Sequence, residues 1–108
     1  MTSEVFAAYL EEMQGETVET LKNKAKEYAT GGDRLHNFRV AAAFQGITEE
    51  QALMGMAAKH LVSIRDMVFD GQKHTIPLWE EKIKDSINCL FLLWAMVCEK
   101  ADAAELTN

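Results

Sequence analysis

The chain has 108 residues, 48% of them hydrophobic, which is enough for one domain with a modest core and excludes a disordered tail. Its formal net charge of −6 and its pI near 5.0 argue against general nucleic-acid binding and against binding to anionic membrane surfaces, since both partners are negatively charged. A small phosphorylated ligand held through a metal ion is still compatible with such an acidic chain.

The first predicted helix begins near the N-terminus, where Thr2 or Ser3 can cap it. Apolar or weakly polar side chains then recur every three or four residues, as on one buried helix face. The members of this stripe are Phe6, Leu10, Met13, Thr17, Leu21, Ala25 and Tyr28. The start of the chain is acidic, unlike the basic start of a secretory signal peptide, so we expect no signal peptide.

Glycines and capping residues mark the next two helices. Gly31-Gly32 can end the first helix, because glycine readily adopts the left-handed conformation found at helix C-termini. Asp33 can cap a short second helix. Thr48 begins the third helix, where Gln51 completes a capping-box pattern.

The fourth helix begins at Thr75, with Pro77 in its first turn, where the missing proline N–H would be unpaired anyway. From Ile87 onward it is apolar nearly all round, but the run to Cys98 is far shorter than the ~20 residues that span a membrane. A helix that is apolar on every side is either central to its domain or shared between subunits. With three other helices to cover it, we expect burial across a homodimer interface.

Cys89 and Cys98 are nine residues apart in this helix and cannot form a disulfide within it. Both fit burial as free thiols, and the chain fits a reducing cytoplasm. No strand pattern or repeat is present, so the sequence predicts a single all-α, four-helix, bundle-like domain over residues 1–108. The expected helices cover about 3–29, 33–45, 48–70 and 76–100, followed by a frayed tail at 101–108.

Polar side chains gather around the first helix break, in the segment KAKEYATGGDRLHNF. Lys24 and Tyr28 share one helix face, and Arg34, Asn37 and Phe38 follow across the glycines. Cationic and amide donors suit phosphates, and an aromatic ring suits stacking on a base. The alternative interpretation is a solvated loop, with the two aromatic rings in the core.

Glu81, Asp85 and Asn88 share one face of the fourth helix, at spacings of four and three. Asp85 and Asn88 should lie near the rim of the core, where an unpaired polar group costs about 1–3 kcal/mol, so something must satisfy them. A basic side chain or a water molecule is one possibility. The other is a hard divalent cation, Mg²⁺ or Mn²⁺, because carboxylate and amide oxygens are its preferred ligands.

The third helix carries polar residues that could face this set. Lys59 and Asp66 lie on one face, whereas His60 falls on the apolar side as a partly buried, hydrogen-bonded histidine. Asp66 could form an ion pair with an arginine, or it could face Glu81 and Asp85. Three converging carboxylates repel one another without a cation. A cation held by few protein ligands keeps waters, one of which can attack phosphorus.

Four segments resemble small phage and prophage proteins related to the MazG-type all-α nucleotide pyrophosphohydrolases. These are KAKEYA at 24–29, HNF at 36–38, KH at 59–60 and EEKIKDSINCL at 80–90, within a similarity that spans about residues 21–93. The resemblance implies an all-α dimer or tetramer that uses Mg²⁺ to split a nucleoside triphosphate into the monophosphate and pyrophosphate. Glu16 and Glu19 have the spacing of the family's Glu-x-x-Glu motif, but they lie far before Glu81 and Asp85.

The first hypothesis is therefore a MazG-like pyrophosphohydrolase that acts on a (d)NTP with Mg²⁺ or Mn²⁺. In it, Glu81 and Asp85 are catalytic and hold the metal, with Asp66 as a third ligand. Lys24, Arg34 and Lys59 contact phosphates, Tyr28, Asn37 and Phe38 shape the nucleoside pocket, and Asn88 also binds substrate. The alternative is a catalytically inactive phage accessory or host-interaction protein on the same scaffold. We expect the partners to be a nucleotide and a second copy of the chain, and we expect no binding to nucleic acid or to a membrane. The expected location is the cytoplasm, which is the host cytoplasm if the protein is phage-encoded.

Overall fold

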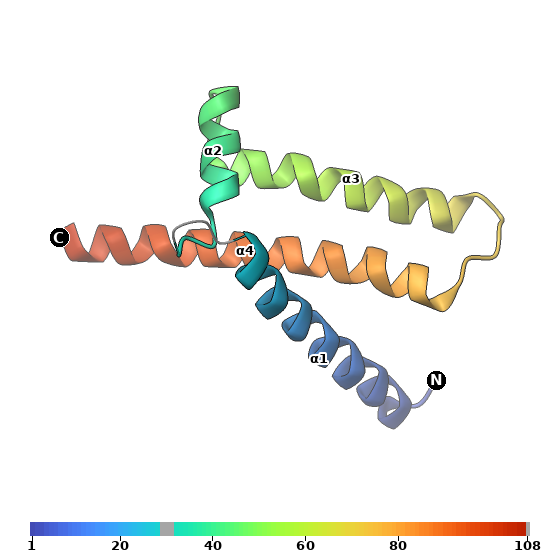
Figure 1. Ribbon diagram of the computed structural model, residues 1–108. Helices are drawn as coiled ribbons and strands as arrows, with labels where there is room; N and C mark the ends of the chain where they lie inside the picture. Colours follow the sequence, from blue (N-terminus) through green and yellow to red (C-terminus); the bar gives the residue numbers. More distant parts are fainter. Residues whose placement is uncertain (29–31, 108) are drawn as a thin grey trace.

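A computed structural model describes residues 1–28 and 32–107, apart from the side chains at 25–28 and 105–107. Four helices follow one another along the chain (Figure 1), and the described residues contain no β-strand. They are α1 (Ser3–Tyr28), α2 (His36–Gln45), α3 (Glu49–Phe69) and α4 (Ile76–Thr107). The prediction of an all-α, four-helix domain is confirmed.

The long helix α4 is the centre of the arrangement. α3 and α4 lie side by side as an antiparallel pair, and α2 stands at a steep angle at the N-terminal end of α3 (Figure 1). α1 crosses the other side of α4 and runs in the same general direction as α4 (Figure 1). Residues in the middle of α4 are therefore placed between α1 and α3.

The hydrophobic core lies where the turn before α2, α2 itself, α3 and α4 meet. Within it, Leu53 of α3 and Met96 of α4 are fully buried. The core residues are Leu35, Phe38, Leu53, Ala57, Cys89 and Met96, with Leu92 and Leu93 packed against them. Phe38 thus belongs to the core, as the alternative interpretation of its ring predicted.

Local side-chain hydrogen bonds begin three of the helices as predicted. Thr2 Oγ1 accepts from the N–H of Val5 at 3.2 Å, and Thr75 Oγ1 accepts from the N–H of Leu78 at 3.3 Å. The capping box of α3 is complete, with Gln51 N–H donating to Thr48 Oγ1 and Thr48 N–H donating to Gln51 Oε1. Such caps satisfy N–H groups that have no partner inside the helix.

Two predicted boundaries were wrong. Asp33 does not cap α2: its Oδ1 accepts from the N–H of Leu35 at 3.0 Å, so a turn precedes the helix, and Leu35 is the N-cap residue without a side-chain cap. α4 does not end near Lys100 but continues to Thr107, because the segment ADAAELT is rich in good helix formers. Gly31, a predicted helix end, and residue 108 lie outside the described residues.

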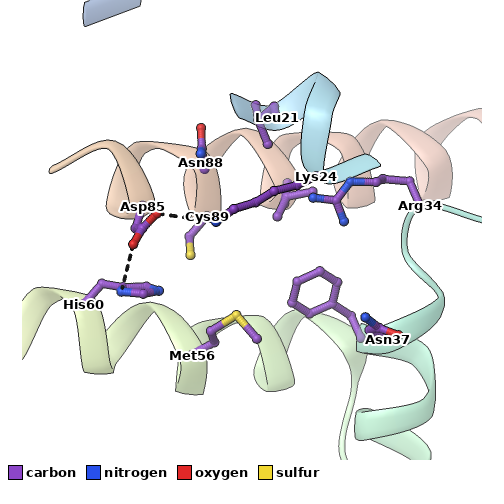
Figure 2. Close-up of a pocket in the computed structure, with 11 residues that line it drawn as sticks. Leu21, Lys24, Arg34, Asn37, Met56, His60, Asp85, Asn88 and Cys89 are labelled. Atoms are coloured by element: carbon purple, nitrogen blue, oxygen red, sulfur yellow. Dashed lines mark ion pairs between the residues drawn. The ribbon is translucent and has the colours of Figure 1, made fainter. Parts of the chain in front are cut away.

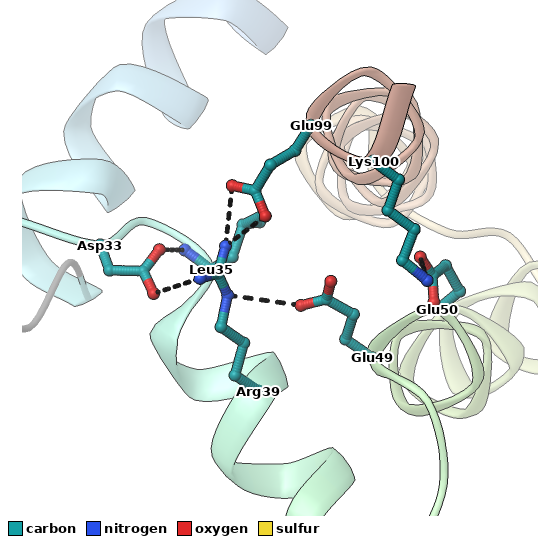
Figure 3. Close-up of polar contacts among 7 residues, drawn as sticks. All are labelled: Asp33, Leu35, Arg39, Glu49, Glu50, Glu99 and Lys100. Carbon is teal, nitrogen blue, oxygen red and sulfur yellow. Dashed lines mark hydrogen bonds and ion pairs between the residues drawn. The ribbon is translucent and has the colours of Figure 1, made fainter. Parts of the chain in front are cut away.

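Ion pairs of Arg39 link α2 to the turn before it, to the start of α3 and to α4 (Figure 3). The Arg39 guanidinium donates to both carboxylate oxygens of Glu99 on α4, at 2.6 and 2.8 Å. It also lies 3.3 Å from Asp33 Oδ2 and 3.4 Å from Glu49 Oε2, at the start of α3. The pKa of Arg39 is raised above its ordinary value, chiefly by the hydrogen bond to Glu99.

Much apolar surface on α1 and α4 is left uncovered. Thr17 on the predicted stripe of α1 is buried, but Phe6 is 55% exposed, and on α4 Trp94 is 66% exposed. The radius of gyration is 16.5 Å, whereas a compact domain of this length would have about 13 Å. The described helices include none that is both long and apolar enough to cross a membrane.

Candidate functional site

A cavity of about 250 Å³ lies between α1, α3 and α4, and residues 34–38 contribute to its wall (Figure 2). Its apolar lining is Leu21, Phe38, Met56, Cys89 and Leu92, and its polar lining is Lys24, Arg34, Asn37, His60, Asp85 and Asn88. The polar residues come from all four helices and from the turn before α2. A concave apolar site with a few convergent polar groups is the usual form of a small-molecule site.

Asp85 lies between a lysine and a histidine from two other helices. Its Oδ1 is 3.5 Å from Lys24 Nζ on α1, and its Oδ2 is 3.9 Å from His60 Nδ1 on α3 (Figure 2). The carboxylate is largely buried, while the Lys24 side chain is 41% exposed. Lys24 is therefore paired with Asp85, while part of its side chain remains exposed to solvent.

Asn88 is the most unusual polar residue of the cavity. It is only 5% exposed, and neither its Oδ1 nor its Nδ2 has a hydrogen-bond partner among the residues that the structure describes. In Figure 2 its side chain projects from α4 toward the side on which Leu21 of α1 lies, whereas Asp85 projects toward His60. An unpaired buried polar group costs about 1–3 kcal/mol, so this amide needs an explanation.

Cys89 forms part of the cavity wall but is poorly suited to nucleophilic chemistry. Burial raises the pKa of its thiol, the charge of Asp85 raises it further, and Lys24 opposes this in part. The reactive form of cysteine is the thiolate, so a raised pKa keeps Cys89 as an inert, packed thiol at neutral pH. Cys98 is also free.

The structure brings together most of the residues that the sequence predicted to bind substrate. Lys24, Arg34, Asn37, Phe38 and Asn88 all line the cavity, together with Asp85, which was predicted to be catalytic and to hold the metal. Lys59 lies outside it, in an adjoining groove between α2 and α3 that shares Asn37 and Phe38 with the cavity. The side chain of Tyr28 lies outside the described residues.

The predicted convergence of Asp66, Glu81 and Asp85 is not found in the described chain. Asp66 is 64% exposed and lies 3.6 Å from Arg65, as the ion-pair alternative anticipated. Among the described residues, no three His, Cys, Asp or Glu side chains are grouped closely enough to hold a metal ion. Although Glu81 and Asp85 are neighbours on α4, they line different hollows: Asp85 lines the cavity between α1, α3 and α4, whereas Glu81 does not.

Glu81 instead lies in a hollow between α1 and α4, which we call the acidic hollow. Its carboxylates are Glu16, Glu19, Glu80 and Glu81. Glu16 Oε2 is buried there without a hydrogen-bond partner in the described chain. Because Thr20 and Glu81 of the hollow each precede a cavity residue, Lys24 and Asp85, by four positions, the acidic hollow lies one helical turn from the cavity.

Sequence reasoning missed the place of Glu16 and Glu19. Their Glu-x-x-Glu spacing was visible, but their distance from Glu81 along the chain argued against a shared site. The deciding fact is that α1 and α4 run in the same direction, which brings the second half of α1 beside the first half of α4. His60 was expected to be partly buried, but its position beside Asp85 was not foreseen.

We compared the chain with models of known protein families, with curated proteins and with solved structures, and none of the three comparisons gave a match. The function must therefore be inferred from the residues and their geometry.

Proposed function

We propose that the chain binds a nucleoside triphosphate in the cavity and hydrolyses it as a MazG-like pyrophosphohydrolase, releasing the monophosphate and pyrophosphate. The observation that carries this proposal is the gathering of Lys24, Arg34, Asp85 and Asn88, far apart in sequence, around one small cavity. In a chain with a net charge of −6, two cationic side chains at one cavity favour an anionic ligand.

Lys24 and Arg34 would contact the phosphates, since cationic donors form strong charge-assisted hydrogen bonds to phosphate oxygens. Lys24 is held near the cavity by Asp85, so a phosphate would take over an ammonium group that is already in position. Lys59 lines the adjoining groove, which shares Asn37 and Phe38 with the cavity, and would contact a part of the ligand that extends into that groove.

A divalent cation fits the donor chemistry of the acidic hollow. Mg²⁺ prefers carboxylate oxygens, uses one or two of them, and keeps several waters beside substrate phosphates. Glu81 would keep its predicted role as a metal ligand, with Glu16 as the second carboxylate, and the unpartnered Oε2 of Glu16 favours this choice. A bound cation supplies an activated water and neutralises phosphate charge, while Asp85 would orient Lys24 and the attacking water.

We also propose that a second copy of the chain covers the exposed apolar surface of α1 and α4. The chain exposes 7906 Å², which is about 1,900 Å² more than expected for a compact protein of 12.1 kDa. Obligate homodimer interfaces bury about 2,000–5,000 Å² in total, which is about 1,000–2,500 Å² per chain. The excess is therefore of the size that a stable homodimer would remove.

The proposed nucleotide chemistry and the free thiols also fit the expected cytoplasmic location.

The test is to incubate the protein with each NTP and dNTP, with MgCl₂ or MnCl₂, and to measure pyrophosphate release. We expect turnover of at least one nucleotide, abolished by Asp85→Asn and by Glu81→Gln. Glu11→Gln, which neutralises an exposed carboxylate elsewhere on α1, is the matched control and should retain activity. Absence of pyrophosphate release with every nucleotide and both metals would rule out the hydrolase.

A second candidate is the inactive accessory protein on the same scaffold. It is favoured by the pairing of Asp85 with Lys24 and His60, which engages this carboxylate within the protein. In that case a nucleotide would raise the melting temperature without being consumed. Chromatography of the nucleotide after incubation separates the two candidates.

A further inference from the structure

The Asn88 amide lacks a partner for its donor and for its acceptor at the same time. It is 5% exposed, and it is one of the residues that line the cavity. Asp85, one turn away on the same helix, is turned toward Lys24 and His60. No described protein group therefore completes the hydrogen bonding of this side chain.

The two unpaired atoms restrict the ligand that could satisfy them. An asparagine amide offers a carbonyl acceptor and an NH₂ donor side by side. A phosphate carries only acceptors, so it would leave the carbonyl oxygen unpaired, and a metal ion would take the oxygen and leave the NH₂ group unpaired. A group that presents a donor next to an acceptor satisfies both atoms, and the edge of a nucleobase is such a group.

The walls beside Asn88 fit the same chemistry. Leu21 of α1 and Leu92 of α4 are apolar, and the neighbouring Cys89 remains a neutral thiol in the cavity wall. A flat, weakly polar ring can pack against such side chains while its edge meets one amide. Lys24, on α1, is more exposed than Asn88, as expected if the charged part of the ligand binds nearer to solvent than the base does.

We propose that Asn88 recognises the hydrogen-bonding edge of a nucleobase, so that the base, rather than a phosphate or the metal, occupies the inner part of the cavity. This inference rests on the proposed nucleotide function and specifies which part of the ligand each polar group meets. It also assigns Asn88 a role in base selection and not in metal binding.

The first experiment separates the base from the phosphates. Calorimetry would measure the binding of adenosine, guanosine, cytidine, uridine and thymidine, which lack phosphates, and of sodium tripolyphosphate, which lacks a base. We expect Asn88→Leu to weaken binding of the preferred nucleoside about 5- to 150-fold, the range for one bidentate amide–base contact, and to leave tripolyphosphate binding unchanged. Asn23→Leu, the same change at an exposed position of α1, is the control.

A second measurement reports the role of the amide without ligand. If Asn88 serves a ligand, the apolar side chain of similar size in Asn88→Leu should raise the melting temperature of the free protein, because a buried unpaired amide is removed. A lower melting temperature together with unchanged nucleoside affinity would show that Asn88 has a structural role, and would overturn the inference.

The wild-type protein provides a test that needs no variant to fold. In a sample with ¹⁵N-labelled asparagine, the side-chain NH₂ signals of Asn88 should shift on addition of the nucleoside and not on addition of tripolyphosphate. If the wild type binds tripolyphosphate but no nucleoside, the base inference fails while the proposed nucleotide function stands. If it binds neither these probes nor any nucleoside triphosphate, both fail.

Discussion

The ammonium nitrogen of Lys24 lies 3.5 Å from Asp85 Oδ1, which links α1 to α4 at the edge of the cavity. The carboxylate is the more buried partner, so Asp85 depends on this cation more than Lys24 depends on the carboxylate. A phosphate that binds Lys24 competes with Asp85 for the same charge. Under the proposed function, the pair would therefore couple ligand binding to the contact between two helices.

Lys24→Met should weaken nucleotide binding by about tenfold or more, because it removes a charge-assisted hydrogen bond worth about 1.5–3 kcal/mol and leaves Asp85 to repel the phosphates. Calorimetry with a triphosphate measures the change. Lys22→Met, an exposed lysine of α1 outside the cavity, should bind as the wild type does. Adding Asp85→Asn to Lys24→Met should restore part of the affinity, and a further loss instead would contradict the charge argument.

Arg39→Leu should lower the melting temperature and make it depend on salt. Without the guanidinium, Asp33, Glu49 and Glu99 would lie near one another uncompensated, and like charges repel. The deficit relative to wild type should shrink in about 1 M NaCl, where charges are screened within about 3 Å. Arg39→Lys should recover only part of the stability, since one ammonium cannot reproduce the planar fork that meets Glu99. A salt-independent deficit would point to lost packing instead.

Acid should destabilise the fold partly through Asp70. Its pKa is lowered, first by the hydrogen bond from the N–H of Gln72 and then by His74. A carboxylate with a lowered folded pKa stabilises the protein above its unfolded pKa, about 3.9, and this contribution is lost as the pH falls through the folded value. Between about pH 5 and pH 2, the melting temperature of Asp70→Asn should therefore fall by less than that of the wild type. Asp102→Asn, at an exposed position, is the control and should behave as the wild type does. An equal fall in melting temperature for Asp70→Asn and the wild type would contradict the prediction.

Trp94→Glu should convert a dimer into a monomer, because it places a charge in the centre of the exposed apolar surface of α4. Light scattering after gel filtration should give about twice 12.1 kDa for the wild type and about 12.1 kDa for the variant. Phe44→Glu alters an even more exposed ring on α2, away from this surface, and should leave the dimer intact. A wild-type monomer at every concentration would refute the proposed assembly.

Local chemistry made the fold largely predictable from the sequence. Two helix starts depend only on residues three positions apart: the capping box of Thr48 and Gln51, and the cap at Thr75. Such patterns can be recognised in the sequence without knowledge of the tertiary structure. Asp33 was misplaced because its carboxylate accepts from the N–H of Leu35 and pairs with Arg39, in the first turn of α2, instead of capping that helix.

The candidate site was predictable only in part, since a helical pattern shows which residues share a face but not which helix that face meets. The cavity does combine Lys24, Arg34 and Asp85, as expected. The predicted contact of Glu81 and Asp66 with Asp85 was wrong for reasons of packing. The path of α1 across α4 places Glu81 in the acidic hollow. Asp66, next to the buried Met67, faces outward. Proximity in space between Glu19 and Glu81 has no counterpart in their spacing along the chain.

Inward-facing and outward-facing residues alternate along one stretch of α4. Asn88, Cys89 and Leu92 line the cavity, while Leu90, Phe91 and Trp94 between and after them face outward. A rotation of this helix about its own axis would turn both rows through the same angle and displace them in opposite directions. A change in the fluorescence of Trp94 would therefore report such a rotation, and any substitution in one row must preserve the orientation of the other.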